Sequence, residues 1–262
     1  MRVRSKGLES RKQFSRWLDF PRPVAEPTVR LVFFPYAGTG VEAFRGWDRF
    51  MPDNVELCSV NYPGRGKRLN EPVVTWVPDL IARMDRALAP FMDVPVVFFG
   101  HCMGGMLCFE LTRALHGRGG PMPASLFLSG VRAPQCPSLY PDMHALADDE
   151  FVSVVKALGL RPDSLFEEDA VVKSTMAVLK GDFQLVETWE TDAAGPGGLP
   201  VPIHVFGGRD DRFVPEPHLR AWDEHTSQDF SARLFPGGHF YLHDDRAGEA
   251  LFSHICTALA SL

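Results

Sequence analysis

A cysteine set between glycines is the first feature of the sequence that could carry out covalent chemistry. Cys102 lies in the segment GHCMG at 100–104, between the apolar run at 96–99 and a helical pattern at 106–115. This context matches the nucleophile elbow G-x-S-x-G, with cysteine in place of serine, and disfavours a cysteine that only packs in the core. The turn presents the thiol at a helix N-terminus, where the helix dipole favours the thiolate. The pattern predicts that Cys102 is a nucleophile.

A nucleophile at an elbow requires an acid and then a histidine further along the chain. Asp211 lies in the loop GGRDDRFVP at 207–215, which follows a predicted strand. His239 lies in the loop PGGHF at 236–240, which also follows a predicted strand. Asp210 is an alternative acid, but the spacing Asp-x-x-Val-Pro begins at Asp211 and favours it. We therefore expect His239 to be the general base and Asp211 to orient it.

Two backbone N–H groups are candidates for an oxyanion hole, which stabilises the negative charge that develops on an attacked carbonyl oxygen. The residue after an elbow nucleophile supplies one of them, here the N–H of Met103. The loop FPYAGTG at 34–40 follows the first predicted strand, and its small residues let the backbone approach a substrate. We assign the second donor to the N–H of Ala37, with Tyr36 as the near alternative. The loop has no lysine and no G-x-x-x-x-G-K-S/T pattern, so it does not match a phosphate-binding loop.

Short apolar runs alternate with helical patterns along most of the chain. The apolar runs predict strands at 30–34, 56–60, 96–99, 125–128, 202–206 and 231–235. Apolar residues at helical spacing predict helices at 77–88, 106–115 and 251–259. This alternation indicates an α/β fold, with a mainly parallel sheet flanked by helices on both faces.

The interval 141–198 breaks this alternation. It contains two helical patterns, at 151–158 and 170–179, and ends in the loose sequence AAGPGG at 193–198. We interpret the interval as a helical lid inserted into a single domain that spans residues 1–262.

The composition excludes several classes of protein. With 27 basic and 33 acidic residues, the formal net charge is −6, so general basicity cannot hold nucleic acid. The five cysteines are scattered without a CxxC pair, which argues against a disulfide framework or a zinc site. No apolar stretch is long enough to cross a membrane, and no apolar region follows the basic residues at 2–12 as a secretory signal requires. We expect a cytoplasmic monomer with no metal and no nucleic-acid or membrane partner.

Six segments together resemble the type II, or discrete, thioesterases of polyketide and nonribosomal-peptide assembly lines, a branch of the α/β-hydrolase superfamily. They are LVFFPYAG at 31–38, YPGRGKR at 62–68, FGHCMGG at 99–105, LFLSGVRAP at 126–134, GGRDDRFV at 207–214 and GGHFYL at 237–242. The resemblance covers nearly the whole chain from Trp17 onward. It implies an α/β-hydrolase fold with a helical lid, a catalytic triad of Cys102, Asp211 and His239, and oxyanion amides at Ala37 and Met103. It also implies an acyl substrate tethered to the phosphopantetheine arm of an acyl or peptidyl carrier protein, with no cofactor of the enzyme's own.

Two residues depart from the pattern of that family. Tyr36 stands where the family usually has histidine, and Cys102 stands where it usually has serine. Attack of a thiol on a thioester gives another thioester, so the acyl group stays activated and can pass to a second thiol or an amine. The sequence therefore leaves two functions open, a thioesterase that hydrolyses the acyl group and an acyltransferase that passes it on. Two further alternatives are disfavoured: a lactone-opening hydrolase by the segments outside the elbow, and a carrier-binding module without activity by the intact triad.

Basic residues near the predicted entrance are candidates for contact with a carrier protein, because carrier proteins are generally acidic. Arg65, Lys67 and Arg68 lie in the loop after the second strand, and Arg212 lies beside the predicted acid. The alternative is a solvated basic turn, or arginines that are tied to the fold.

Overall fold

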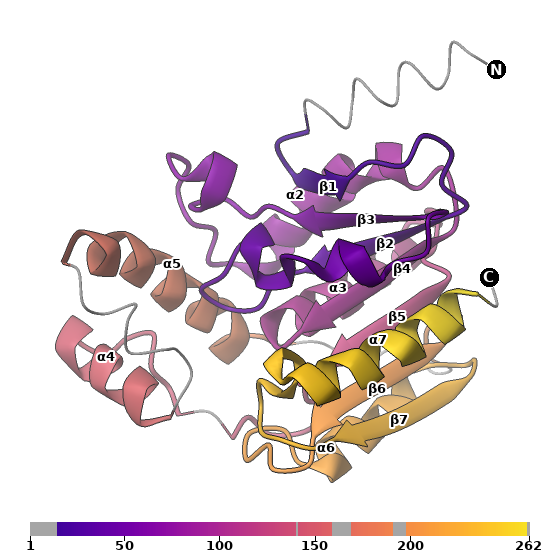
Figure 1. The fold of residues 1–262 in the computed structure, drawn as a ribbon. Helices are drawn as coiled ribbons and strands as arrows, with labels where there is room; N and C mark the ends of the chain where they lie inside the picture. The colour runs from indigo at the N-terminus through magenta and orange to yellow at the C-terminus, as the bar shows by residue number, and fades with distance from the viewer. Residues whose placement is uncertain (1–14, 140, 159–168, 191–197, 261–262) are drawn as a thin grey trace.

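A sheet of seven strands forms the centre of the described part of the molecule (Figure 1). The computed structural model describes residues 15–139, 141–158, 169–190 and 198–260. The strand order is β1-β3-β2-β4-β5-β6-β7, and only the pair β1 and β3 is antiparallel. The predicted α/β fold with a mainly parallel sheet is confirmed, and all six predicted strands are present. The bounds are Leu18–Arg22 (β1), Val29–Phe34 (β2), Val55–Val60 (β3), Val96–His101 (β4), Ser125–Ser129 (β5), Ile203–Gly208 (β6) and Phe230–Phe235 (β7).

Helices cover both faces of this sheet. In Figure 1, α7 lies across the near face, and α2 and α3 lie behind the strands. The helices predicted at 77–88, 106–115 and 251–259 are present, although α3 begins at Met103 and α7 begins earlier because the Asp244 carboxylate caps its first turn. None of the described helices combines the length and the apolar composition that a bilayer span requires. The bounds of the described α-helices are Val77–Leu88 (α2), Met103–Gly117 (α3), Asp148–Ala157 (α4), Asp169–Glu187 (α5), Glu216–Arg220 (α6) and Asp245–Leu259 (α7).

The interior strand β2 shows how one strand contributes to the core on both faces of the sheet. Leu31 and Phe33 pack on the side of α7, whereas Val32 and Phe34 pack on the side of α2 and α3. All four side chains are at most 2% exposed. Successive side chains of a strand point to opposite faces, so a strand covered on both faces is mostly apolar, and the one charged residue of β2, Arg30, is paired with Glu56. This is why the run VRLVFF could be recognised as a buried strand.

The edge strand β1 was not predicted from the sequence. Its sequence, LDFPR, is short and contains Pro21, which cannot donate a hydrogen bond to a neighbouring strand. Among the described strands β1 pairs with β3 alone, and the register shifts between Asp19 and Arg22, around this proline. An edge position and a register shift are both circumstances in which a strand tolerates proline, and neither can be recognised from the local sequence.

The helices α4 and α5 both fall within the interval 141–198. They lie beyond one end of the sheet, at the left of Figure 1. α5 continues well past its predicted end at residue 179, because its apolar face continues with Phe183 and Val186. Most of the loose segment at 193–198 and the basic segment at 2–12 lie outside the described residues. The single domain and the lid role of the interval remain predictions.

Candidate active site

The turn between β4 and α3 holds Cys102 in a strained backbone conformation. Its φ is 53° and its ψ is −120°, and among the described residues it is the only non-glycine residue with a positive φ. Its N–H donates to the carbonyl oxygen of Ser129 at 2.8 Å, and its own carbonyl oxygen accepts from the N–H of Gly105 at 3.0 Å. Strained residues of this kind persist only where the surrounding structure enforces them, and they cluster at functional sites. The turn places the thiol at the carboxyl end of the sheet and at the N-terminus of α3.

Two glycines allow this turn to form. A Cβ atom at Gly100 would lie 2.2 Å from the backbone of Gly104, and a Cβ atom at Gly104 would lie 1.9 Å from the carbonyl oxygen of Phe34. A side chain at either position would therefore push α3 away from the ends of β4 and β2. Since Phe34 begins the loop at 34–40, this close approach also brings the first turn of α3 against that loop.

His239 and Asp211 meet across the loops that follow β7 and β6. The Nδ1 of His239 donates to the Oδ2 of Asp211 at 2.7 Å, and Oδ1 of Asp211 accepts from the N–H of Phe213 and Val214 at 2.9 and 3.1 Å. Both side chains are buried, whereas Asp210 is exposed. The structure therefore brings Asp211, rather than Asp210, to the histidine.

His239 also interacts with Cys102, so the three predicted triad residues come together at one place. Burial opposes a charge on His239, but its hydrogen bonds to Asp211 and Cys102, together with their negative charge, outweigh this effect and raise its pKa to about 10. The ring of His101 lies 4.9 Å from that of His239. Burial and the neighbouring His239 hold the pKa of His101 well below its ordinary value. The cluster thus combines one imidazole that favours the charged form with one that favours the neutral form.

We expect the titration of His239 to report its contact with Cys102. In the wild-type protein the imidazolium should persist through neutral pH and be lost as the pH rises through about 10. Because this pKa lies above the ordinary value of 6.5, protonation of His239 stabilises the fold fully below pH 6.5, and the stabilisation is lost as the pH rises through about 10. In Cys102→Ala one of the groups that raise the pKa is removed, so His239 should titrate at lower pH.

Nuclear magnetic resonance of the imidazole nitrogens measures this shift directly. His204 is an internal reference, because its ring interacts with Ser231 and burial lowers its pKa independently of Cys102. An unchanged titration of His239 in Cys102→Ala would show that the thiol does not contribute to its pKa.

The loop at 34–40 brings Ala37 next to Cys102, since both residues line one hollow. The carbonyl oxygen of Tyr36 accepts from the N–H and the Oγ1 of Thr39, at 3.1 and 2.6 Å. These bonds fix the peptide plane that carries the N–H of Ala37, because that plane is rigid. Within the described residues, no acceptor is bonded to the N–H of Ala37 or of Met103. The hydroxyl of Tyr36 interacts instead with Nε2 of a histidine further along the chain, His243, at 2.9 Å.

Two small and mostly apolar hollows open beside Cys102, and both are lined by Val186 of α5. One is bounded by Met106, Val131 and Trp189, and the other by Ala37 and the site histidine. Apolar walls of this kind suit an apolar acyl group. In the part of the chain that is described, no three His, Cys, Asp or Glu side chains are grouped so as to hold a metal ion.

Sequence reasoning missed a buried network beneath the elbow. The Nδ1 of His101 lies 2.9 Å from the Oγ of Ser129, which lies 2.7 Å from the hydroxyl of Tyr241. All three side chains are buried. The network joins the ends of β4 and β5 to the segment after β7, so it supports the relative positions of Cys102 and His239. The only sequence signal was that His101 and Tyr241 lie within two residues of the predicted triad.

The four candidate docking residues fall into two groups. Arg65 and Arg68 are 8% and 5% exposed, so the prediction that they contact a carrier protein is wrong. The alternative of arginines tied to the fold applies to both: Arg65 forms a bidentate ion pair with Asp182, and Arg68 is held in an ion pair as well. Lys67 and Arg212 are exposed and remain candidates.

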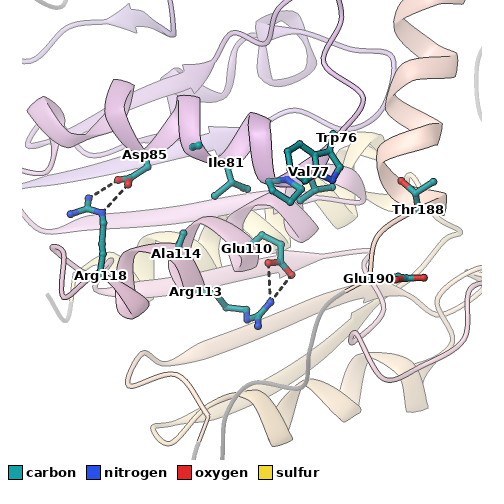
Figure 2. Close-up of a pocket in the computed structure, with 12 residues that line it drawn as sticks. Trp76, Val77, Ile81, Asp85, Glu110, Arg113, Ala114, Arg118, Thr188 and Glu190 are labelled. Carbon is teal, nitrogen blue, oxygen red and sulfur yellow. Dashed lines mark hydrogen bonds and ion pairs between the residues drawn. The ribbon is translucent and has the colours of Figure 1, made fainter.

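A larger groove lies away from Cys102, between α2, α3 and the end of α5 (Figure 2). Its volume is about 710 Å³, and Trp76 at its edge is 66% exposed. Four of the charged residues in it form two ion pairs: Arg118 with Asp85 at 2.5 and 2.8 Å, and Arg113 with Glu110 at 3.0 Å. None of the predicted site residues lies in this groove, so it is not the predicted reaction site.

The fold and the site together define the class of this protein. A mainly parallel sheet with a strained nucleophile-type residue between β4 and α3, followed by an acid after β6 and a histidine after β7, is the framework of an α/β hydrolase. The sequence profile of the thioesterase domain matches residues 29–259. The chain therefore belongs to the thioesterase family.

Individual relatives agree with this assignment. The gramicidin S biosynthesis protein GrsT of Aneurinibacillus migulanus is 31% identical over 234 residues, which cover 89% of this chain and 91% of GrsT. The thioesterase RedJ from the prodiginine pathway of Streptomyces coelicolor superimposes with a TM-score of 0.81 at 33% identity and covers 91% of both chains. The type II thioesterase BorB from the borrelidin cluster superimposes with a TM-score of 0.82 at 30% identity, over 92% of this chain and 96% of BorB. The predicted α/β-hydrolase fold is thereby confirmed.

Proposed function

We propose that this thioesterase is of the discrete, type II kind and releases acyl groups from the phosphopantetheine arm of a carrier protein, in the biosynthesis of a polyketide or nonribosomal peptide. The observation that carries the proposal is the meeting of Cys102, in its strained turn, with the His239–Asp211 pair. The setting is supported by the relatives, which are named for gramicidin S biosynthesis, the prodiginine pathway and the borrelidin cluster. The protein acts as a cytoplasmic monomer without a cofactor of its own.

The first half of the reaction transfers the acyl group to the enzyme. The sulfur of Cys102 attacks the carbonyl carbon of the thioester while its proton resides on His239. The carbonyl oxygen becomes negatively charged and accepts hydrogen bonds from the N–H of Ala37 and Met103. When the carbon–sulfur bond to phosphopantetheine breaks, His239 protonates the leaving thiol, and Asp211 stabilises the imidazolium throughout.

The second half releases the acyl group to water. His239 accepts a proton from a water molecule, whose oxygen attacks the carbonyl carbon of the acyl-Cys102 thioester. The bond to the sulfur of Cys102 then breaks, and the thiolate regains its histidine partner. The net reaction consumes one water and yields a free acid and the free thiol of the carrier.

A second candidate function, acyl transfer, is favoured by one observation, the cysteine at position 102. Exchange between two thioesters is nearly neutral in free energy, so an acyl group on Cys102 can pass to the thiol of another carrier or to an amine. An oxoester on serine would be less activated and would exchange poorly with thiols. Water and a second carrier are thus competing acceptors for the same intermediate.

A single-turnover experiment decides between these acceptors. The protein is mixed with acyl-loaded carrier, with and without a second, unloaded carrier, and all species are weighed by intact-protein mass spectrometry. Hydrolysis predicts free acid in both arms, whereas transfer predicts acyl group on the second carrier. If the loaded carrier keeps its acyl group in both arms, the proposed function is wrong.

Replacing Cys102 by serine should shift this balance toward hydrolysis. His239 can still activate water in Cys102→Ser, whereas the oxoester intermediate reacts poorly with an incoming thiol. In the two-carrier experiment we expect the fraction of acyl group on the second carrier to fall relative to the free acid. If Cys102 is only a tolerated replacement, the wild-type protein already gives free acid alone, and the second carrier changes nothing.

Lys67 is the clearest remaining candidate for contact with an acidic carrier protein. Its side chain is 63% exposed, and it lies between two arginines that are buried in the same loop. We expect Lys67→Glu to raise KM for a carrier-bound substrate and to leave KM for an acyl-N-acetylcysteamine thioester unchanged. An equal rise for both substrates would indicate that Lys67, which pairs with Asp19, acts on the fold instead.

A further inference from the structure

A carboxylate on α5 contacts the loop that carries Ala37. Asp182 is only 1% exposed, so its charge must be compensated within the protein. Its Oδ2 accepts from the N–H of Gly38 and from Nη1 of Arg65, both at 2.6 Å, and its Oδ1 accepts from Nη2 of Arg65 at 2.7 Å. None of the proposed catalytic steps uses this carboxylate.

Arg65 extends this contact along the loop. Its Nη1 also donates to the carbonyl oxygen of Thr39 at 3.0 Å. Burial opposes the charge of Arg65, but Asp182 outweighs burial and raises the pKa of Arg65 above its ordinary value. Pairing matters for chemistry as well as for stability, because an uncompensated carboxylate here would repel the negative charge that develops in the oxyanion hole.

The two peptide planes that flank Ala37 are thus held by two different partners. Thr39 fixes the plane before Ala37 through the carbonyl oxygen of Tyr36, and Asp182 fixes the plane after it through the N–H of Gly38. Because each plane is rigid, the backbone of Ala37 has little remaining freedom to turn its N–H away.

The same helix covers the cavity at Cys102. Leu179, Phe183 and Val186 of α5 line the hollow that contains Cys102 and Ala37. Close packing at a neighbouring position seats the helix, since a Cβ atom at Gly181 would lie 2.6 Å from a methyl carbon of Val73. The contacts of Asp182 with the loop therefore exist only while α5 is seated over the cavity.

We propose that Asp182 is a positioning residue for the oxyanion hole. By accepting from Gly38 and Arg65 it holds the loop at 34–40 in place and so directs the N–H of Ala37 toward the substrate oxygen. The proposal rests on the thioesterase mechanism proposed above. It makes the oxyanion hole dependent on the position of α5, because the helix that covers the acyl group also supplies the contact that fixes the donor.

The variant Asp182→Asn tests this role, because it keeps the size of the side chain and removes its charge. We expect kcat for an acyl-N-acetylcysteamine thioester to fall about 10²-fold, the effect of a small misplacement of a catalytic group. The affinity for an aldehyde analogue, whose adduct with Cys102 places its oxygen in the oxyanion hole, should fall in parallel. Alkylation of Cys102 by iodoacetamide forms no oxyanion and should keep its wild-type rate.

Glu187→Gln is the matched control on the same helix. The carboxylate of Glu187 is also buried and also accepts from backbone N–H groups, those of Met143 and His144 at 2.9 and 3.1 Å. It does not contact the loop at 34–40, so the variant should keep the wild-type ratio of hydrolysis to alkylation, whatever its melting temperature. The proposal is overturned if Glu187→Gln also loses hydrolysis while it keeps alkylation of Cys102. It is overturned as well if Asp182→Asn loses hydrolysis and alkylation equally.

A second variant, Arg65→Lys, applies the same test if Asp182→Asn does not fold. Lysine keeps the positive charge but loses the two-pronged contact with Asp182, so the same two measurements should fall by a smaller factor. If the wild-type protein hydrolyses the thioester and the variants have the same kcat as the wild type, the positioning role is refuted and the proposed function stands. A wild-type protein that is alkylated at Cys102 but does not hydrolyse the thioester would refute the proposed function instead.

Discussion

Replacing Cys102 by alanine is expected to abolish the acyl-enzyme and to lower turnover by about 10⁴-fold or more, the scale on which removal of a nucleophile acts. In the proposed reaction the thiol of Cys102 is the attacking group, and alanine leaves no atom at this position that can attack a thioester. The fold should persist, because alanine removes one atom and meets the same backbone strain at φ 53°. Intact-protein mass spectrometry with acyl-loaded carrier measures the adduct, and thermal unfolding measures the fold.

The other four cysteines provide the control for this prediction. Cys108 and Cys58 are buried, and burial raises the pKa of the Cys108 thiol well above its ordinary value. Burial also raises the pKa of Cys136 and of Cys256. Since the thiolate is the reactive species, iodoacetamide should label Cys102 first under native conditions. Equal labelling of Cys108 or Cys256 would contradict the assignment of the nucleophile.

Local sequence patterns were sufficient to predict the sheet and to predict that the candidate site residues lie close together. Strands such as 29–34 and 96–101 are covered on both faces and are therefore mostly apolar, which makes them visible in a single sequence. Parallel strands share one carboxyl edge, so an elbow after β4, an acid after β6 and a histidine after β7 must lie at that edge. The pairing of Asp211 with His239 follows this topology.

What the sequence could not provide are contacts that join distant segments without a local pattern. Asp182 is one of three acids on α5, and nothing near it in the sequence indicates that it accepts from Gly38, which is 144 positions away along the chain. The sequence left open whether Arg65 and Arg68 are docking charges or arginines tied to the fold, and the structure shows both buried against acids. A charged residue in a loop is usually solvated, so only its partner shows that it is structural.

Removal of the imidazole in His239→Ala is expected to lower turnover by about 10⁴- to 10⁶-fold, because in the proposed mechanism the histidine acts in both halves of the reaction. In that mechanism His239 holds the proton of Cys102, returns a proton to the leaving thiol, and then activates water. Single-turnover measurements separate these roles, since both acylation and deacylation should slow. A variant that acylates normally and fails only in deacylation would show that Cys102 does not need His239 to attack.

Replacement of the acid should separate the two adjacent aspartates. Asp211→Asn keeps the shape of the side chain, but its amide offers Nδ1 of His239 no negative charge, so turnover should fall by up to about 10⁴-fold. Asp210→Asn is the matched control, because Asp210 is exposed and should leave turnover close to that of the wild type. The titration of His239 gives a second readout: its pKa should fall from about 10 in Asp211→Asn, since Asp211 raises it, and should stay unchanged in Asp210→Asn. A greater loss of turnover in Asp210→Asn, with the histidine titration unaltered in Asp211→Asn, would mean that Asp210 and not Asp211 orients the base.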